Sequence, residues 1–166
     1  MSNTKNQHPL KRIAIIAYDN NQKHLIEWSF FNRQFLQQHQ LTALGDNARL
    51  LQGTLGIQVA ALPAPAMSGY QELAKMIRKE EIDVIIFMGG SSDLNPPDTG
   101  IKELLQLAIE HNVITAVNTV TAGIILESLR VDSSPLQTNY DHFPQKKDNR
   151  LYGINNQLVI PAQAFG

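Results

Sequence analysis

The chain has 166 residues, no cysteine and a formal net charge of −1, from 14 lysines and arginines against 15 aspartates and glutamates. This length predicts one domain with a single core, and the absence of cysteine excludes disulfides, thiolate metal sites and thiol nucleophiles. The balanced charge argues against nucleic acid or an anionic membrane as a partner. Residues 1–11 form a polar extension without the apolar core of a signal peptide, and no apolar run approaches the roughly 18 residues that span a bilayer. We therefore expect a cytoplasmic protein.

The first half of the chain alternates between strand and helix patterns. An unbroken apolar run at 13–17 is typical of a strand covered on both faces. Apolar residues at helical spacing, Phe31 among them, predict one long helix over 20–40. The next elements are a strand over 41–45, a short helix that Asn47 caps and that Gly53 or Gly56 ends, and a strand over 57–62.

The second half continues the same alternation. Ser68 is expected to cap the next helix, and Ile109 is expected to face inward from the one after it. The predicted elements are a helix over 69–81, a strand over 82–88, a helix over 99–112, a strand over 113–117 and a helix over 121–129.

Five strands alternating with helices of crossover length predict the fold class. It is α/β, a doubly wound, mostly parallel five-stranded sheet with helices on both faces. We place this domain at residues 12–130. Residues 131–166 form a C-terminal tail, in which we expect an edge strand or a subunit contact.

Ligands in such sheets bind beyond the carboxyl ends of the strands, where the strand order reverses. The predicted strand ends are rich in small polar residues, and glycine or serine at a helix N-terminus suits an anion, although these residue types also serve turns and caps. Five scattered histidines indicate no metal site, and we predict no cofactor. The candidate ligand-binding residues are Lys23, Gly45, Asp46, Asn47, Ser68, Gly69, Gly89, Gly90, Ser91 and Asn118.

The order of motifs from about residue 12 to 128 resembles the methylglyoxal synthase family. The segments that carry the resemblance are Ile-Ala-Ile-Ile-Ala-Tyr-Asp at 13–19 with Trp28, Ala-Leu-Gly at 43–45, Met-Ser-Gly-Tyr-Gln at 67–71, Ile-Asp-Val-Ile-Ile-Phe at 82–87, Pro96, and Ala-Val-Asn-Thr-Val-Thr-Ala at 116–122. The match lies more in the framework than in the site.

The resemblance implies a reaction and a set of catalytic positions. Methylglyoxal synthases convert dihydroxyacetone phosphate to methylglyoxal and phosphate, using an aspartate that removes a carbon-bound proton. The family's first aspartate is kept as Asp19, the candidate base, which by itself is as well explained as a helix cap. Tyr18 stands at a family histidine, Tyr70 replaces the catalytic aspartate ahead of Gln71, and Pro97 stands at a second histidine.

The positions that the resemblance assigns to phosphate binding are also changed. The family's Thr-Gly-Thr-Thr-Gly turn reads Leu-Gly-Asp-Asn-Ala at 44–48, so that Asp46 would repel a phosphate. Gln22 stands at a family lysine, for which Lys23 is a neighbouring substitute or merely a solvated side chain. Gly89 stands at a family arginine.

Three functions follow from this pattern. The first is a methylglyoxal synthase-like protein, impaired for dihydroxyacetone phosphate, that binds a small polar metabolite, with or without a phosphate group, or acts in regulation. The second is an active phosphate lyase with a rearranged site that uses Asp19, and the third is a structural oligomer without a ligand. The resemblance further implies a homo-oligomer, since the synthases form hexamers.

Overall fold

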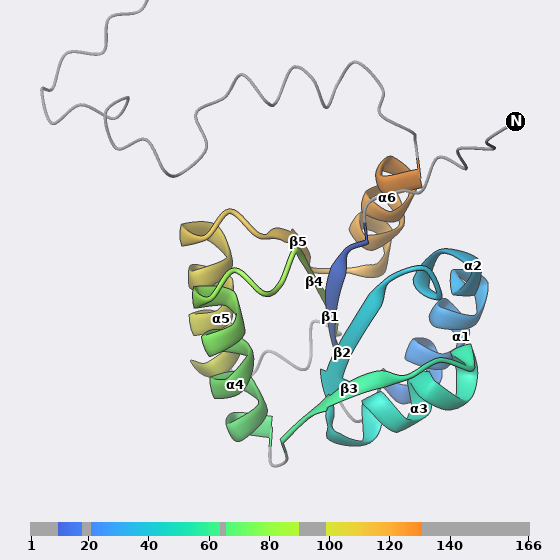
Figure 1. Cartoon of the computed structure of the whole chain (residues 1–166), viewed down its shortest axis with the longest axis horizontal. Helices are drawn as coiled ribbons and strands as arrows, with labels where there is room; N and C mark the ends of the chain where they lie inside the picture. The colour runs from blue at the N-terminus through green and yellow to red at the C-terminus, as the bar shows by residue number, and fades with distance from the viewer. Residues whose placement is uncertain (1–9, 18–20, 64–65, 90–98, 131–166) are drawn as a thin grey trace, which may run out of the picture. The chain divides into compact units, whose positions relative to one another are not determined.

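The computed structural model describes residues 10–17, 21–63, 66–89 and 99–130 (Figure 1). Five parallel strands form one sheet in the order β3-β2-β1-β4-β5. The strands are β1 (Arg12–Ala17), β2 (Gln40–Leu44), β3 (Val59–Leu62), β4 (Val84–Met88) and β5 (Ile114–Ala116). The helices are α1 (Gln22–Phe31), α2 (Arg33–Leu36), α3 (Gly45–Leu55), α4 (Ala66–Arg78), α5 (Thr99–Glu110) and α6 (Thr119–Arg130).

Helices cover both faces of this sheet. In Figure 1, α4 and α5 lie on one side of the strands, whereas α1, α2 and α3 lie on the other. Alternate residues of β1 enter the two cores, because successive side chains of a strand point to opposite faces. Ile13 and Ile15 pack with α1, α2, α3 and α6, while Ala14 and Ile16 pack with α4 and α5. The predicted doubly wound α/β fold is confirmed.

The predicted helix over 20–40 is wrong in one respect, because Asn32 divides it into α1 and α2. The Asn32 side-chain amide and its backbone N–H both donate to the carbonyl of Trp28, at 2.8 and 3.1 Å, and so end α1. Phe31 was expected inside, yet it is 81% exposed. The stripe that reaches the core runs through Leu25 and Trp28, and Phe31 lies beside this stripe.

Several other helix boundaries also differ from the prediction. Asn47 is not a cap, since α3 begins at Gly45, and Ser68 is not a cap, since α4 begins at Ala66. Gly56, one of the two predicted ends of α3, is the C-cap in the left-handed conformation with φ 67°. Ile109, predicted to face inward, is 81% exposed near the end of α5.

The two ends of the chain are not described in the structure. Residues 1–9 and 131–166 lie outside the described residues, so that the N-terminal extension and the C-terminal tail stay predictions. Within the described ranges, no helix is both long enough and apolar enough to cross a bilayer.

Candidate functional site

The strand order places the expected ligand crevice between β1 and β4. The chain runs from β1 outward through β2 to β3 on one side, and then returns through α4 to β4 on the other side of β1. The carboxyl ends of these two strands therefore meet at the switch point, where doubly wound proteins bind their ligands. Of the predicted site residues, Tyr18, Asp19, Gly90 and Ser91 lie outside the described residues. Gly89 follows β4 directly and is exposed.

The start of α3 lies at this carboxyl edge, directly after β2. Gly45 takes a positive φ of 37° at the turn from strand to helix. Asp46 is exposed in the first turn of α3, with its carboxylate 3.5 Å from the guanidinium of Arg49. A carboxylate in this position interacts favourably with the positive end of the helix dipole, which is the feature that otherwise attracts an anionic ligand.

Asn47 joins the start of α3 to the end of β1. Its side chain is buried, and its Nδ2 donates a hydrogen bond of 2.6 Å to the carbonyl of Ala17. The Oδ1 of Asn47 is also buried and has no hydrogen-bond partner among the described residues. The amide group therefore ties the start of α3 to the end of β1, a role that neither the cap prediction nor the ligand-binding prediction anticipated.

The start of α4 packs closely against the ends of β2 and β3. A Cβ atom added at Gly69 would collide with Leu44 Cδ2 and lie 2.8 Å from the carbonyl oxygen of Pro63. Glycine at this position thus has a packing role. The next residue, Tyr70, is 5% exposed and belongs to the core between the sheet and the layer of α4 and α5.

Tyr70 and Gln71 also line a groove between α4 and α5. The groove has a volume of about 460 Å³, and Gly100 and Glu103 of α5 contribute to its other side. Gln71 is exposed there, whereas Ser68 is half-buried one turn earlier in α4. Tyr70 and Gln71, which are neighbours in the sequence, thus lie in the layer that α4 and α5 form, and the other two predicted catalytic positions lie outside the described residues.

Two of the remaining candidates have local structural partners. Lys23 is 89% exposed, and its Nζ lies 3.9 Å from Glu27 on the same helix. Asn118 follows β5, and its Oδ1 accepts a hydrogen bond of 2.8 Å from the backbone N–H of Thr121. Asn118 is thus the N-cap of α6, a role typical of asparagine at the start of a helix.

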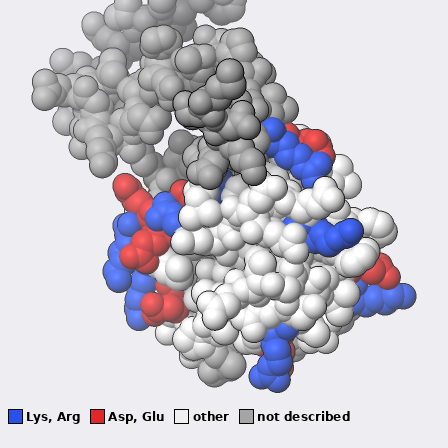
Figure 2. Space-filling view, turned by 45° about the vertical axis from the view of Figure 1, so that its right-hand side comes forward, with Lys and Arg blue, Asp and Glu red and all other residues white. Residues whose placement is uncertain are grey.

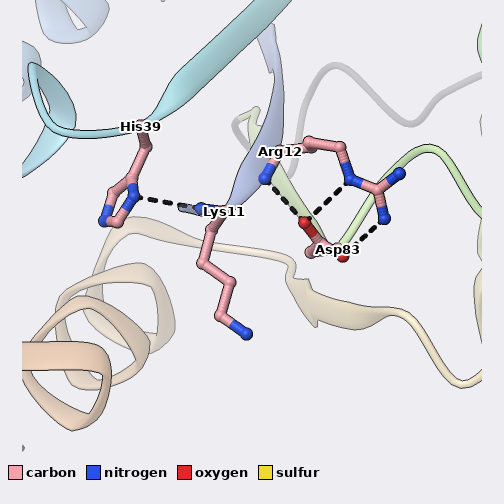
Figure 3. A network of polar contacts seen from close by, with 4 residues as sticks. All are labelled: Lys11, Arg12, His39 and Asp83. Carbon is pink, nitrogen blue, oxygen red and sulfur yellow. Dashed lines mark hydrogen bonds and ion pairs between the residues drawn. The ribbon is translucent and has the colours of Figure 1, made fainter. Parts of the chain in front are cut away.

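A polar network that the sequence reading missed lies at the opposite, amino edge of the sheet (Figure 3). Arg12 donates to Asp83 from its backbone N–H at 2.7 Å and from its guanidinium at 3.0 and 2.8 Å. Beside it, the backbone N–H of Lys11 donates to His39 Nδ1 at 3.2 Å. The sequence does contain a signal for this pair. Arg12 stands directly before the apolar run at 13–17, and Asp83, of opposite charge, stands directly before the apolar residues at 84–88.

The ion pair shifts the titration of both partners. Burial, the largest single effect, raises the pKa of Asp83, but the hydrogen bonds and charge of Arg12 outweigh it and hold that pKa below its ordinary value. The hydrogen bond to Asp83 raises the pKa of Arg12 in turn. This pair joins the amino ends of the neighbouring strands β1 and β4, at the edge opposite the carboxyl ends, so we assign it to the framework.

Within 10–17, 21–63, 66–89 and 99–130, no group of three histidine, aspartate or glutamate side chains is placed to hold a metal ion.

The sheet order defines a doubly wound α/β domain whose strand order reverses between β1 and β4. The chain belongs to the methylglyoxal synthase family. It is 34% identical over 139 residues to the methylglyoxal synthase of Yersinia enterocolitica serotype O:8 / biotype 1B, a match that covers 82% of this chain and 91% of that protein.

Further relatives agree with this assignment. The methylglyoxal synthase of Yersinia pestis strain Pestoides F is also 34% identical over 139 residues, covering 82% of this chain and 90% of that protein. The crystal structure of methylglyoxal synthase from Elizabethkingia anophelis NUHP1 matches with a TM-score of 0.65 at 30% identity, covering 76% of this chain and 80% of that one. No protein-family model matches the chain. The resemblance read from the sequence is thereby confirmed.

Proposed function

We propose that this chain is a methylglyoxal synthase-like protein that converts dihydroxyacetone phosphate poorly and binds a small polar metabolite, in a binding or regulatory role. The observation that carries the proposal is the burial of Tyr70, which stands where the resemblance implies the catalytic aspartate. The supporting observations are the negative charge at the start of α3 and the exposure of the lysine in the first turn of α1.

Tyr70 is poorly suited to remove a proton from carbon. An unperturbed phenol has a pKa of about 10, so very little of it is ionised at neutral pH. The side chain is 5% exposed and belongs to the core between the sheet and the layer of α4 and α5. The position therefore supports a packing role in place of general-base catalysis.

The start of α3 is poorly suited to a phosphate group. Asp46 already provides the negative charge that the N-terminus of the helix favours. A phosphate bound nearby would meet a like charge, which costs about 1 kcal/mol at 4 Å in water and more where solvent is excluded. Lys23 in the first turn of α1 is 89% exposed and lies beside Glu27. These charges favour an uncharged or cationic metabolite over a phosphate ester.

The direct test of impaired catalysis is a turnover assay with dihydroxyacetone phosphate. We expect the purified protein to release no more methylglyoxal than its Asp19→Asn variant, because the described residues of the site provide neither a positioned base nor a cationic cradle. Methylglyoxal is measured with a carbonyl reagent, and phosphate release is measured in parallel. Robust turnover that disappears in Asp19→Asn would sink the proposal.

A second test addresses ligand charge through thermal unfolding. A ligand that binds the native state raises its stability by mass action, by about 2.7 kcal/mol when present at 100 times its Kd. We expect no shift with millimolar phosphate, dihydroxyacetone phosphate or a phosphoglycolate-type mimic, and a gain of phosphate response in Asp46→Thr. Glu110→Thr is the control, since it removes the same charge from the far end of α5. Equal responses in the two variants would show that net charge alone matters.

The alternative function is an active methylglyoxal synthase with Asp19 as base in a rearranged site. It is favoured by membership of the family and by retention of the family's first aspartate in the sequence. This alternative predicts stabilisation by the phosphoglycolate-type mimic in the unaltered protein. The two experiments above therefore separate the two functions.

A further inference from the structure

The first turn of α3 contains a buried hydrogen-bond acceptor that the described fold does not use. Asn47 is 4% exposed, and its Nδ2 is occupied by the hydrogen bond to the carbonyl of Ala17. Its Oδ1 has no hydrogen-bond partner among the described residues. Both atoms belong to one planar amide group, so Oδ1 also lies beside the carboxyl end of β1. A buried polar atom without a partner costs folding free energy, so this atom calls for a group that donates to it.

The same turn also offers hydrogen-bond donors. The first N–H groups of an α-helix have no partner within the helix itself. Leu44, the N-cap residue of α3, provides no side-chain hydrogen bond to them. The start of α3 therefore presents backbone donors and the Asn47 acceptor within a single turn.

The start of α6 differs in this respect, although an asparagine stands there too. Asn118 is the N-cap of α6, and its Oδ1 accepts a hydrogen bond of 2.8 Å from the backbone N–H of Thr121. Its side-chain oxygen thus satisfies one of the free donors of its own helix. In α3 the asparagine side chain turns to β1 instead, which leaves both its oxygen and the helix donors for another group.

The charges at the start of α3 limit which group can meet both needs. Asp46 is 76% exposed and lies 3.5 Å from Arg49, so its carboxylate opposes a bound anion. A cation would meet the positive end of the helix dipole. Figure 2 shows lysine and arginine mostly beside aspartate or glutamate, without a broad area of one sign in this view, so no extended field from this surface selects a charged ligand. The turn therefore favours a neutral group.

We infer that the start of α3 binds a neutral metabolite through a hydroxyl group, which donates to Asn47 Oδ1 and accepts from an N–H of the first turn. A hydroxyl both donates and accepts at one atom, whereas an ionised carboxylate only accepts and an ammonium group only donates. The inference rests on the proposed function, because it names the class of the small polar metabolite.

The test is nuclear magnetic resonance of the isotope-labelled full chain, titrated with glycerol, erythritol and sorbitol. With at least one of these polyols we expect a saturable shift of the backbone amides at 45–48 and of the Asn47 side-chain amide. The amides at 119–121 are the internal control, since the asparagine at the start of α6 is already engaged. Acetate accepts only, methylammonium donates only, and acetamide separates its donor from its acceptor, so we expect no comparable shift with these three probes.

Asn47→Ala removes the acceptor, and we expect the Kd of the polyol to rise about tenfold, as for the loss of one hydrogen bond. This variant also loses the hydrogen bond to Ala17, so circular dichroism checks its fold. A crystal structure of the unaltered protein with the polyol is a second measurement that needs no variant. There we expect a ligand hydroxyl within hydrogen-bond distance of Asn47 Oδ1.

Several results would overturn the inference. They are no response to any polyol, equal shifts at 119–121, an equal response to acetate, methylammonium or acetamide, and an ordered water that keeps its place on Asn47 Oδ1 at saturating polyol. The turnover assay judges the proposed function separately. Robust methylglyoxal release would contradict that function, whereas absent turnover together with no polyol response would contradict this inference alone.

Discussion

At the scale of single residues, Gly69 shows how one missing side chain brings the predicted site region together. Its backbone approaches Leu44 and Pro63 so closely that a Cβ atom has no room. This approach sets the start of α4, and it accompanies the burial of Tyr70 in the core next to it. Residues that look like a ligand-binding turn in the sequence are thus explained by packing.

We expect Gly69→Ala to destabilise the protein by about 1 to 3 kcal/mol, because the added methyl group overpacks a tight contact with backbone and side chain. The measurement is urea unfolding followed by circular dichroism. Gly53→Ala is the control, since no atom lies within 4 Å of its added Cβ in α3. There, loss of chain entropy in the unfolded state is expected to stabilise by about 0.5 to 1 kcal/mol. Equal effects would contradict the packing argument.

At the scale of elements, α3 and β1 are joined by one buried side chain. The hydrogen bond from Asn47 to the Ala17 carbonyl crosses from the helix after β2 to the end of the neighbouring strand. It fixes the start of α3 to the carboxyl end of β1, on one side of the switch point. The position of α3 at the carboxyl edge therefore depends on a buried contact.

Asn47→Ala is expected to cost about 1 to 3 kcal/mol of folding free energy, because it leaves a buried carbonyl without its donor. Chemical denaturation measures this loss, and hydrogen exchange of the α3 amides locates it. Gln106→Ala removes an exposed side-chain amide that bonds only to Glu110, so it is expected to change stability by less than about 0.5 kcal/mol. A loss of stability without faster exchange in α3 would argue against the bracing role.

At the scale of the whole molecule, the ion pair between Arg12 and Asp83 closes the amino ends of β1 and β4. β1 is the central strand of the sheet and β4 is its neighbour, and each is buried on both faces. The pair is partly exposed, with side-chain exposures of 38% for Arg12 and 28% for Asp83, so that water screens part of its energy. Its three hydrogen bonds nevertheless connect the halves on either side of the switch point.

This pair makes stability depend on pH in a defined direction. The folded pKa of Asp83 lies below its ordinary value of 3.8, so the unfolded chain takes up a proton first as the pH falls. The stabilisation is complete well above pH 3.8, and it disappears as the pH drops through the lower folded pKa. We expect Asp83→Asn to be less stable than the unaltered protein at pH 7. As the pH falls, its free energy of unfolding is expected to decrease less than that of the unaltered protein. Parallel acid dependences in the two proteins would contradict this assignment.

The fold could be predicted well from the sequence, and the site less well. The strands at 13–17 and 82–88 are recognisable because a strand covered on both faces reads as an unbroken apolar run, a strictly local signal. The roles of Asn47 and Tyr70 depend on contacts with residues that lie far away in the sequence, so local spacing carried no information about these roles. Phe31 and Ile109 were misplaced because helical periodicity finds apolar stripes but does not show how far the neighbouring layer extends.

The sequence by itself determined the α/β alternation, the parallel sheet and the family, since these depend on local hydrophobic patterns and on motifs in a preserved order. Only the tertiary structure decided that Tyr70 is a core residue, that Asn47 braces β1, and that Lys23 is solvated. The physical reason is that burial and hydrogen bonding depend on which elements come together in space. A residue's chemistry is therefore known from the sequence, whereas its environment is established only when distant segments pack.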